Sequence, residues 1–304
     1  MSHILIHEVG LRDGLQVEKQ VVPTDLKLAW IERLIEARLD IIQVGSFVHP
    51  EKVPQMADTD ELFRRLAGRS QGTVLSGLVL NEKGLERGLA CGVGMFCLGV
   101  SASETHSRKN TGMGTEEATR RIIATALEAR KAGKRVQVSV QSAFGCGFEG
   151  PVDPERVMHI VASYLEQGLH AISLADTAGH AHPDQVRAMV ERILHMEPTA
   201  EVTAHIHNTY GLGMASTYAA IGAGARCVET AFGGLGGCPF TKVAAGNVAT
   251  EDLVHGLQRV DHCPDIDLQT VIAVAREVAG HFGRELPGCV YKTGPITPPA
   301  KVQS

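Results

Sequence analysis

The feature that most constrains the fold of this chain is the regular alternation of short apolar runs with longer amphipathic stretches. The apolar runs have the length of strands, and the stretches between them carry apolar residues at helical spacing. Strand-like runs cover residues 4–9, 41–44, 73–79, 95–100, 135–140, 171–174, 202–206 and 227–230. Helix-like stretches cover residues 24–37, 115–132, 154–167, 183–196 and 210–223. About eight strand–helix units in 304 residues predict a (β/α)8 TIM barrel.

Local signals support the helix assignments and the domain organisation. Asp153 followed by Pro154 is a typical helix start. A doubly wound sheet is less favoured, because no GxGxxG motif follows a strand and opens a helix. Two more helices are expected at 249–260 and 268–283, before a Pro- and Gly-rich loose tail or closing segment. We therefore expect one domain over 1–304, with the barrel over about 1–248 and a C-terminal helical extension and tail over about 249–304.

Composition excludes several classes of protein. The net charge is −5 and aromatic residues make up 4% of the chain, so nucleic-acid binding is not expected. No apolar run approaches the ~18 residues of a membrane-spanning helix. The first residues lack the charged and apolar regions of a signal peptide. The seven Cys residues have no CxxC spacing, which indicates reduced thiols and a cytoplasmic location.

Polar residues follow the predicted strands at their C-terminal ends, where TIM barrels carry their active sites. Arg12 and Asp13 follow the first strand, and His205 and His207 end the seventh. Strand side chains alternate between faces, so the two His residues should point the same way. An Asp with two such His residues is a credible site for a divalent cation. Arg12 is placed to stabilise an oxyanion, so the pattern predicts a metal-dependent enzyme for a carbonyl or carboxylate.

Each of these features also has a simpler explanation. The Arg12–Asp13 pair could be a structural salt bridge, and one His of the His-x-His pair could be hydrogen-bonded in the core. The Gly-rich run around Cys238 could be a passive connector. Four Gly residues flanking one Cys are nevertheless unusual in a connector, and mobile Gly loops often act as lids.

Longer motifs are spread over nearly the whole chain, roughly residues 4–282. They are EVGLRDGLQ at 8–16, SFV at 46–48, VPQM at 53–56, SLADT at 173–177, HIH at 205–207, GLGGCPF at 234–240 and GNVATEDL at 246–253. Together they resemble the motifs of the 3-hydroxy-3-methylglutaryl-CoA lyase family in the DRE-TIM metallolyase superfamily. The resemblance implies that Mg²⁺ or Mn²⁺ is bound by Asp13, His205, His207 and Asn247.

The resemblance also implies roles for other residues. Arg12 would stabilise an enolate, Cys238 would act as acid or base on a mobile loop, and Asp176 would be an active-site carboxylate near the metal. Substrate contacts are expected from Gln16, Gln43, Ser46 and Asn208.

The reaction implied by the resemblance is a retro-Claisen cleavage. A 3-hydroxyacyl-CoA thioester is cleaved between C2 and C3, which gives acetyl-CoA and a keto acid. Charge collects on the thioester oxygen in this reaction, and a cation such as Arg12 can stabilise it. An acyl-CoA substrate, a homo-oligomer (a dimer or larger) and a place in leucine degradation are also expected from the resemblance.

Three positions depart from the family pattern. Gln43 stands where Glu is usual, Asn208 stands where Asp is usual, and Leu11 replaces a common Pro. Because two carboxylates are lost, two candidate substrates are kept. One is 3-hydroxy-3-methylglutaryl-CoA, and the other is a related thioester such as citramalyl-CoA, whose cleavage would give acetyl-CoA and pyruvate. A Claisen-type synthase is disfavoured by the Gly-Gly-Cys-Pro loop. A non-catalytic binding barrel is disfavoured because the metal and catalytic set is complete.

Overall fold

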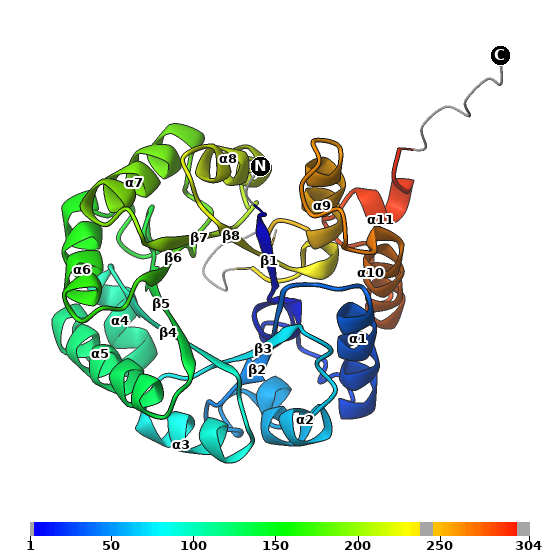
Figure 1. The fold of residues 1–304 in the computed structure, drawn as a ribbon, viewed down its shortest axis with the longest axis horizontal. Coiled ribbons are helices and arrows are strands. Elements are labelled where there is room, and N and C mark those ends of the chain that lie inside the picture. The colour runs from blue at the N-terminus through cyan, green and yellow to red at the C-terminus, as the bar shows by residue number, and fades with distance from the viewer. Residues whose placement is uncertain (1–2, 238–245, 297–304) are drawn as a thin grey trace.

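The computed structural model describes residues 3–237 and 246–296, and it confirms the predicted (β/α)8 barrel. Each strand pairs in parallel with the next, and β8 pairs with β1 to close the barrel (Figure 1). The strands are β1 (Leu5–Glu8), β2 (Ile41–Ser46), β3 (Val74–Leu78), β4 (Met95–Ser101), β5 (Arg135–Gln141), β6 (Ala171–Asp176), β7 (Glu201–Ile206) and β8 (Cys227–Thr230). All eight fall where apolar runs predict them.

Helices surround the barrel on its outside (Figure 1). They are α1 (Thr24–Glu36), α2 (Thr59–Arg65), α3 (Glu82–Ala90), α4 (Glu104–Thr111), α5 (Thr115–Lys131), α6 (Pro154–Glu166), α7 (Pro183–Met196), α8 (Gly213–Gly222), α9 (Thr250–Gln258), α10 (Leu268–Phe282) and α11 (Val290–Thr293). Sequence reasoning missed α2, α3, α4 and α11, because helices of one to three turns give little periodic signal.

The predicted start and end of α6 are confirmed. The side chain of Asp153 accepts a hydrogen bond from the backbone N–H of Glu155, and Pro154 is the first helical residue. After the helix, Gly168 has a φ of 69°, a left-handed conformation that Gly adopts without a Cβ clash. The chain can therefore turn directly from α6 into β6.

The C-terminal helices complete the outer layer beside α1. The backbone N–H of Asp267, at the start of α10, donates to the carbonyl of Ala37 at 2.9 Å. Trp30 of α1 is fully buried, with its ring edge against His281 of α10. Tyr291 of α11 is buried within the expected tail, so part of that segment packs on the barrel as a closing segment.

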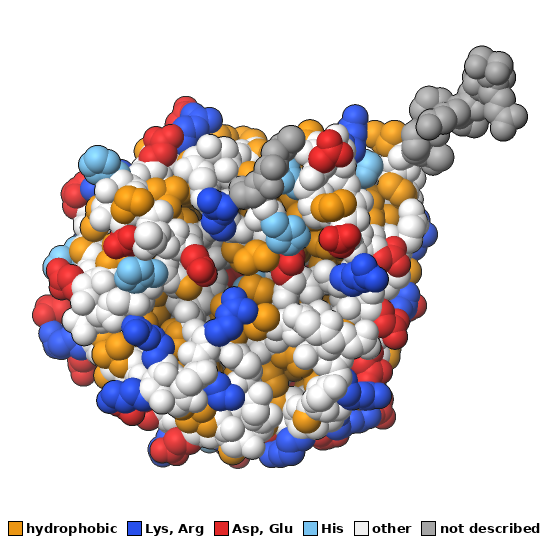
Figure 2. Space-filling view, in the orientation of Figure 1, with side chains coloured by type: hydrophobic (Ala, Val, Ile, Leu, Met, Phe, Trp, Pro, Cys, Tyr) orange, Lys and Arg blue, Asp and Glu red, His pale blue; other side chains and the backbone are white. Residues whose placement is uncertain are grey.

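The β1–β8 pairing sets the position of the site. Leu5 aligns with Cys227 and Glu8 aligns with Thr230, so the turn after β1 and the ends of β7 and β8 lie at one rim. Lys and Arg side chains alternate with Asp and Glu on the face shown in Figure 2, which therefore carries mixed charge. Within the part of the chain that the structure describes, no helix is long and apolar enough to cross a membrane.

Candidate active site

Arg12 and Asp13 lie on a single π-helical turn, Gly10–Gly14, directly after β1. The turn closes through the backbone N–H groups of Asp13 and Gly14, which both donate to the carbonyl of Val9. Single π-helical turns occur often at functional sites. Nη1 of Arg12 donates to Oδ1 of Asp13 at 2.6 Å. The two adjacent residues therefore present one charge pair to the barrel mouth.

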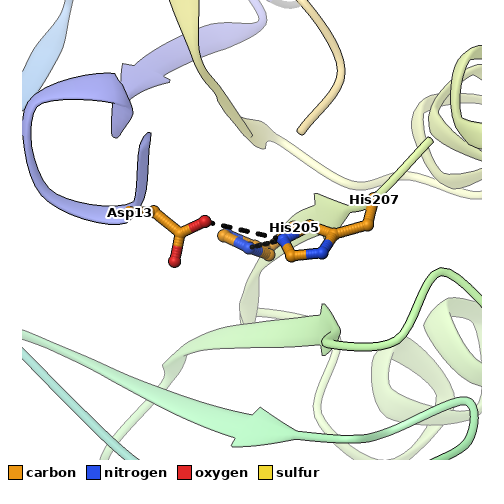
Figure 3. Close-up of side chains that lie close together, drawn as sticks. All are labelled: Asp13, His205 and His207. Atoms are coloured by element: carbon orange, nitrogen blue, oxygen red, sulfur yellow. Dashed lines mark hydrogen bonds and ion pairs between the residues drawn. The ribbon is translucent and has the colours of Figure 1, made fainter. Parts of the chain in front are cut away.

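His205 and His207 face the same way, as strand alternation predicts. Their Nε2 atoms lie 3.1 Å apart, and Nε2 of His207 lies 3.6 Å from Oδ2 of Asp13. Both His residues are buried, and the ligand atoms of all three side chains lie within 4.8 Å of one another. Figure 3 shows Asp13 directed from the turn after β1 toward the two rings on β7.

Asn247 joins this cluster through the backbone. The backbone N–H of Val248 donates to the carbonyl of Ile206, and the backbone N–H of Asn208 donates to the carbonyl of Gly246. This short antiparallel contact with the end of β7 holds Asn247 opposite His207. Nδ2 of Asn247 then lies 2.8 Å from Oδ2 of Asp13.

Gly236 passes directly over these ligand atoms. A Cβ added there would lie 2.5 Å from Nδ2 of Asn247 and 3.1 Å from Oδ2 of Asp13. Any side chain at this position would therefore collide with the cluster. The requirement for Gly here explains part of the Gly-rich motif.

Burial and charge set the ionisation of the cluster. Burial alone would raise the pKa of Asp13, but the Arg12 guanidinium and the two His residues hold this pKa well below its usual range. Burial alone would likewise raise the pKa of Glu229, but the hydrogen bonds and charges of His205 and His7 lower it. Both carboxylates are therefore ionised at neutral pH.

The donor set of the cluster fits a divalent cation. Within residues 3–237 and 246–296, Oδ1 of Asn247 is buried and has no hydrogen-bond partner. Two cis ligand atoms of an octahedral ion bound at about 2.1 Å lie about 3 Å apart, and the Nε2 atoms of His205 and His207 have this spacing. One carboxylate, two imidazoles and one amide oxygen form a mixed oxygen and nitrogen donor set that a divalent cation can bind.

The predicted residues Gln16 and Gln43 line the same cleft as Arg12 and the cluster. Oε1 of Gln43 accepts a hydrogen bond from Nε of Arg12, and Asp13 accepts from Nη1. Nη2 of Arg12 has no hydrogen-bond partner in the described part of the chain. The cleft has a volume of about 1330 Å³, above the roughly 300–1,000 Å³ of common ligand pockets.

Three other predicted residues lie outside the set that lines this cleft. Ser46 is buried against Thr59, and Asn208 accepts a hydrogen bond from the backbone N–H of Gly213 at the start of α8. The two oxygens of Asp176 accept hydrogen bonds from the backbone N–H groups of His180 and Ala181. Burial raises the pKa of Asp176. The side chains of Asp176 and Asn208 therefore order the loops around the site, whereas Ser46 contacts Thr59 through its backbone and its hydroxyl has no hydrogen-bond partner among the described residues.

Cys238, predicted as the acid or base, lies outside the described residues, so its role stays a prediction. Glu229 was not among the predicted residues, although its Oε2 lies 2.6 Å from Nδ1 of His205. The signal in the sequence was an acidic residue inside the apolar run 227–230.

Comparison with known proteins finds relatives that are acyl-CoA lyases or belong to their family. The model of the HMGL-like family matches residues 3–278. The chain is 39% identical to (R)-citramalyl-CoA lyase of Chloroflexus aurantiacus, over 98% of this chain and 97% of the relative. It is 34% identical to the hydroxymethylglutaryl-CoA lyase YngG of Bacillus subtilis, over 93% of this chain and 95% of the relative.

Solved structures agree with this result. An HMG-CoA lyase from Acinetobacter baumannii, in complex with coenzyme A and 3-methylmalate, superposes with a TM-score of 0.90 at 35% identity. The match covers 97% of each chain. The HMG-CoA lyase of Bacillus subtilis has a TM-score of 0.92 at 33% identity, over 96% of this chain and 99% of that one. The chain belongs to the HMGL-like family of carbon–carbon lyases.

Proposed function

We propose that this protein is a divalent-metal-dependent lyase that cleaves a 3-hydroxyacyl-CoA thioester to acetyl-CoA and a keto acid. The observation that carries the proposal is the position of Arg12. Its guanidinium contacts Asp13 of the metal-ligand cluster, and both line a cleft of about 1330 Å³. A fixed cation beside a candidate metal site is what a retro-Claisen reaction requires.

Asp13, His205, His207 and Asn247 would hold the cation, Mg²⁺ or Mn²⁺. When bound, the cation supplies positive charge that lowers the pKa of the substrate hydroxyl and orients the substrate. Gln43 and Asp13 each accept a hydrogen bond from Arg12 and so fix the plane of its guanidinium. Once a base has taken the proton of the C3 hydroxyl, the C–C electron pair moves onto the thioester as C3 becomes a carbonyl, and Arg12 is preorganised to stabilise the negative charge that forms on the thioester oxygen.

The enolate of acetyl-CoA must then take up a proton at carbon. Cys238, in the Gly-Gly-Cys-Pro motif, is our candidate for the group that supplies it. The loop that leads to Cys238 passes over the cluster at Gly236. We propose Cys238 as the proton donor because it directly follows Gly236 and Gly237 in this motif.

There are two candidate substrates, and observations support each of them. The family relatives include hydroxymethylglutaryl-CoA lyases at 34–38% identity and a citramalyl-CoA lyase at 39%. Gln43 keeps the hydrogen bond to Arg12 without adding a negative charge to the cleft. We propose a 3-hydroxy-3-methylglutaryl-CoA-like substrate, with citramalyl-CoA as the second candidate.

The test is a panel of 3-hydroxyacyl-CoA thioesters with Mg²⁺ or Mn²⁺, measuring released acetyl-CoA and keto acid. Release of acetoacetate supports the first substrate and release of pyruvate supports the second. A chelator should abolish turnover, and added cation should restore it. Absence of metal-dependent release from every thioester would reject the proposal.

Other expectations accompany this function. We propose a cytoplasmic location and a homo-oligomer, a dimer or larger. A place in leucine degradation follows only if 3-hydroxy-3-methylglutaryl-CoA is the preferred substrate, so the thioester panel decides this as well.

A further inference from the structure

A chain of four buried polar side chains crosses the interior of the barrel. Oε2 of Glu229 on β8 accepts from Nδ1 of His205 on β7 at 2.6 Å. Oε1 of Glu229 faces Nδ1 of His7 on β1 at 3.5 Å. Nε2 of His7 lies 2.8 Å from Oγ of Ser76 on β3. None of the four residues is more than 6% exposed, so water does not screen these contacts.

The carboxylate determines where the protons lie along this chain. An ionised Glu can only accept hydrogen bonds, so Nδ1 of His205 must carry a proton. In the neutral imidazole, Nε2 of His205 then keeps its lone pair, and this is the atom that faces His207. Nδ1 of His7 faces the other oxygen of Glu229, and Nε2 of His7 shares a hydrogen bond with Oγ of Ser76, whose hydroxyl also lies 3.4 Å from the carbonyl of Ile42.

Such a chain is unusual inside a TIM barrel. The interior is normally filled by layers of branched apolar side chains. Polar groups placed there cost free energy unless they are paired. His7 and Ser76 do not line the cleft, yet His7 contacts the carboxylate that accepts from His205, and Ser76 reaches that carboxylate through His7. Their burial is best explained by what they do for that carboxylate.

Given the metal site proposed above, we propose that Glu229 is its positioning residue, and that His7 and Ser76 hold Glu229 in place. Glu229 fixes the tautomer and the ring orientation of His205, so that Nε2 is ready to bind the cation. A carboxylate behind a ligating His also makes the imidazole a better ligand. His7 and Ser76 restrict the rotamer of Glu229 from its other side.

The experiment measures Mn²⁺ affinity of the metal-free protein by electron paramagnetic resonance of free Mn²⁺. Glu229→Gln keeps the shape of the side chain but removes its charge. We expect it to weaken Mn²⁺ binding by about 10- to 100-fold, the usual effect of losing such a partner. Turnover of Glu229→Gln should recover in part at high Mn²⁺ concentration. His7→Gln and Ser76→Ala should each weaken Mn²⁺ binding by a smaller factor.

Tyr164→Phe is the matched control. It removes one buried hydrogen bond, from the hydroxyl of Tyr164 on the outer helix α6 to the backbone carbonyl of Ser139 on β5. Tyr164→Phe should lower the melting temperature but leave the Mn²⁺ affinity unchanged. If the role of Glu229 were purely structural, Glu229→Gln would also lower the melting temperature without changing the Mn²⁺ affinity.

The outcomes separate this inference from the proposed function. Failure of the wild-type protein to bind Mn²⁺ would reject the metal site itself. Binding by wild type with equal affinity in folded Glu229→Gln would reject only the positioning role. If Glu229→Gln does not fold, His7→Gln decides: weaker Mn²⁺ binding supports the proposal, and unchanged binding overturns it.

Discussion

Nδ2 of Asn247 donates a hydrogen bond to Oδ2 of Asp13 over 2.8 Å, although the two residues are 234 positions apart in the chain. The contact spans the seam at which β1 meets β8. It leaves Oδ1 of Asn247 buried without a partner among the described residues. The seam therefore brings the two ends of the barrel sequence together around one set of ligand atoms.

His205→Ala should remove bound metal and activity together. The imidazole supplies one of the three clustered ligand atoms, and Ala offers no replacement. Metal content by mass spectrometry and turnover with added Mn²⁺ are the measurements. His170→Ala is the matched control, because His170 lies before β6 at the other end of the barrel and should not affect either quantity. Retention of both metal and turnover in His205→Ala would mean that the site is misassigned.

Arg12→Lys should lower kcat by about 10²–10³-fold, the usual effect of losing a donor to a developing oxyanion, and change KM much less. Arg12 reaches Gln43 and Asp13 at once through different nitrogens, whereas Lys has a single ammonium group. Steady-state kinetics with saturating metal separate the two parameters. A change confined to KM would instead make Arg12 a substrate-binding residue.

Gln43→Glu should shift substrate preference toward 3-hydroxy-3-methylglutaryl-CoA, by about tenfold or more in the ratio of kcat/KM values. We expect this thioester to be at best one of several substrates of the wild-type protein, because Gln43 adds no charge to the cleft. Asn208→Asp is the comparison. Its side chain is engaged with the backbone of Gly213, so it should shift the ratio less. Strong wild-type preference for 3-hydroxy-3-methylglutaryl-CoA over all other thioesters would count against this prediction.

Glu251→Gln should stabilise the protein at alkaline pH. Burial raises the pKa of Glu251 from about 4.5 to about 8, and the backbone N–H of Gly233 donates to Oε2. The folded chain therefore holds a proton that the unfolded chain releases, so this contribution to stability is complete below about pH 4.5 and falls as the pH rises through about 8.

The Gln amide oxygen can keep the bond to Gly233 and does not ionise. Melting curves of wild type and Glu251→Gln should nearly coincide at pH 5. At pH 8 the variant should melt higher by about 10 °C, since the pKa rises by more than three units from about 4.5 to about 8, one unit corresponds to about 1.4 kcal/mol, and 1 kcal/mol shifts Tm by about 2–4 °C in domains of about 150–250 residues. Equal differences at both pH values would contradict the assignment.

Cys238→Ser should keep metal and thioester binding but lose most turnover, because Ser is a much weaker acid than Cys. In wild type, Cys238 should be alkylated faster than the buried Cys91, Cys97 and Cys227, and a non-cleavable thioester should protect it. Cys289 is exposed, so the experiment uses a Cys289→Ser background. Near-wild-type turnover in Cys238→Ser would leave Cys238 without a catalytic role.

Sequence patterns predict the parts of the structure that depend on local periodicity. The eight strands follow from apolar runs, and the shared direction of His205 and His207 follows from strand alternation. The position of Asn247 beside His207 depends on backbone pairing across the barrel rim, which no local pattern encodes. The contact of Glu229 with His7 depends on the register of β8 against β1, and the hydrogen bond from Gly213 to Asn208 depends on a turn geometry that the motif does not show.

Closure of the barrel by β1 and β8 also has a consequence for the time at which the protein becomes active during its synthesis. Asp13 leaves the ribosome early, whereas Asn247 emerges only after all eight strands have been made. A nascent chain or a fragment that ends before β8 cannot assemble the proposed ligand set. Because only the closed barrel can bind the metal in this way, metal binding would stabilise the closed barrel relative to any partly folded form.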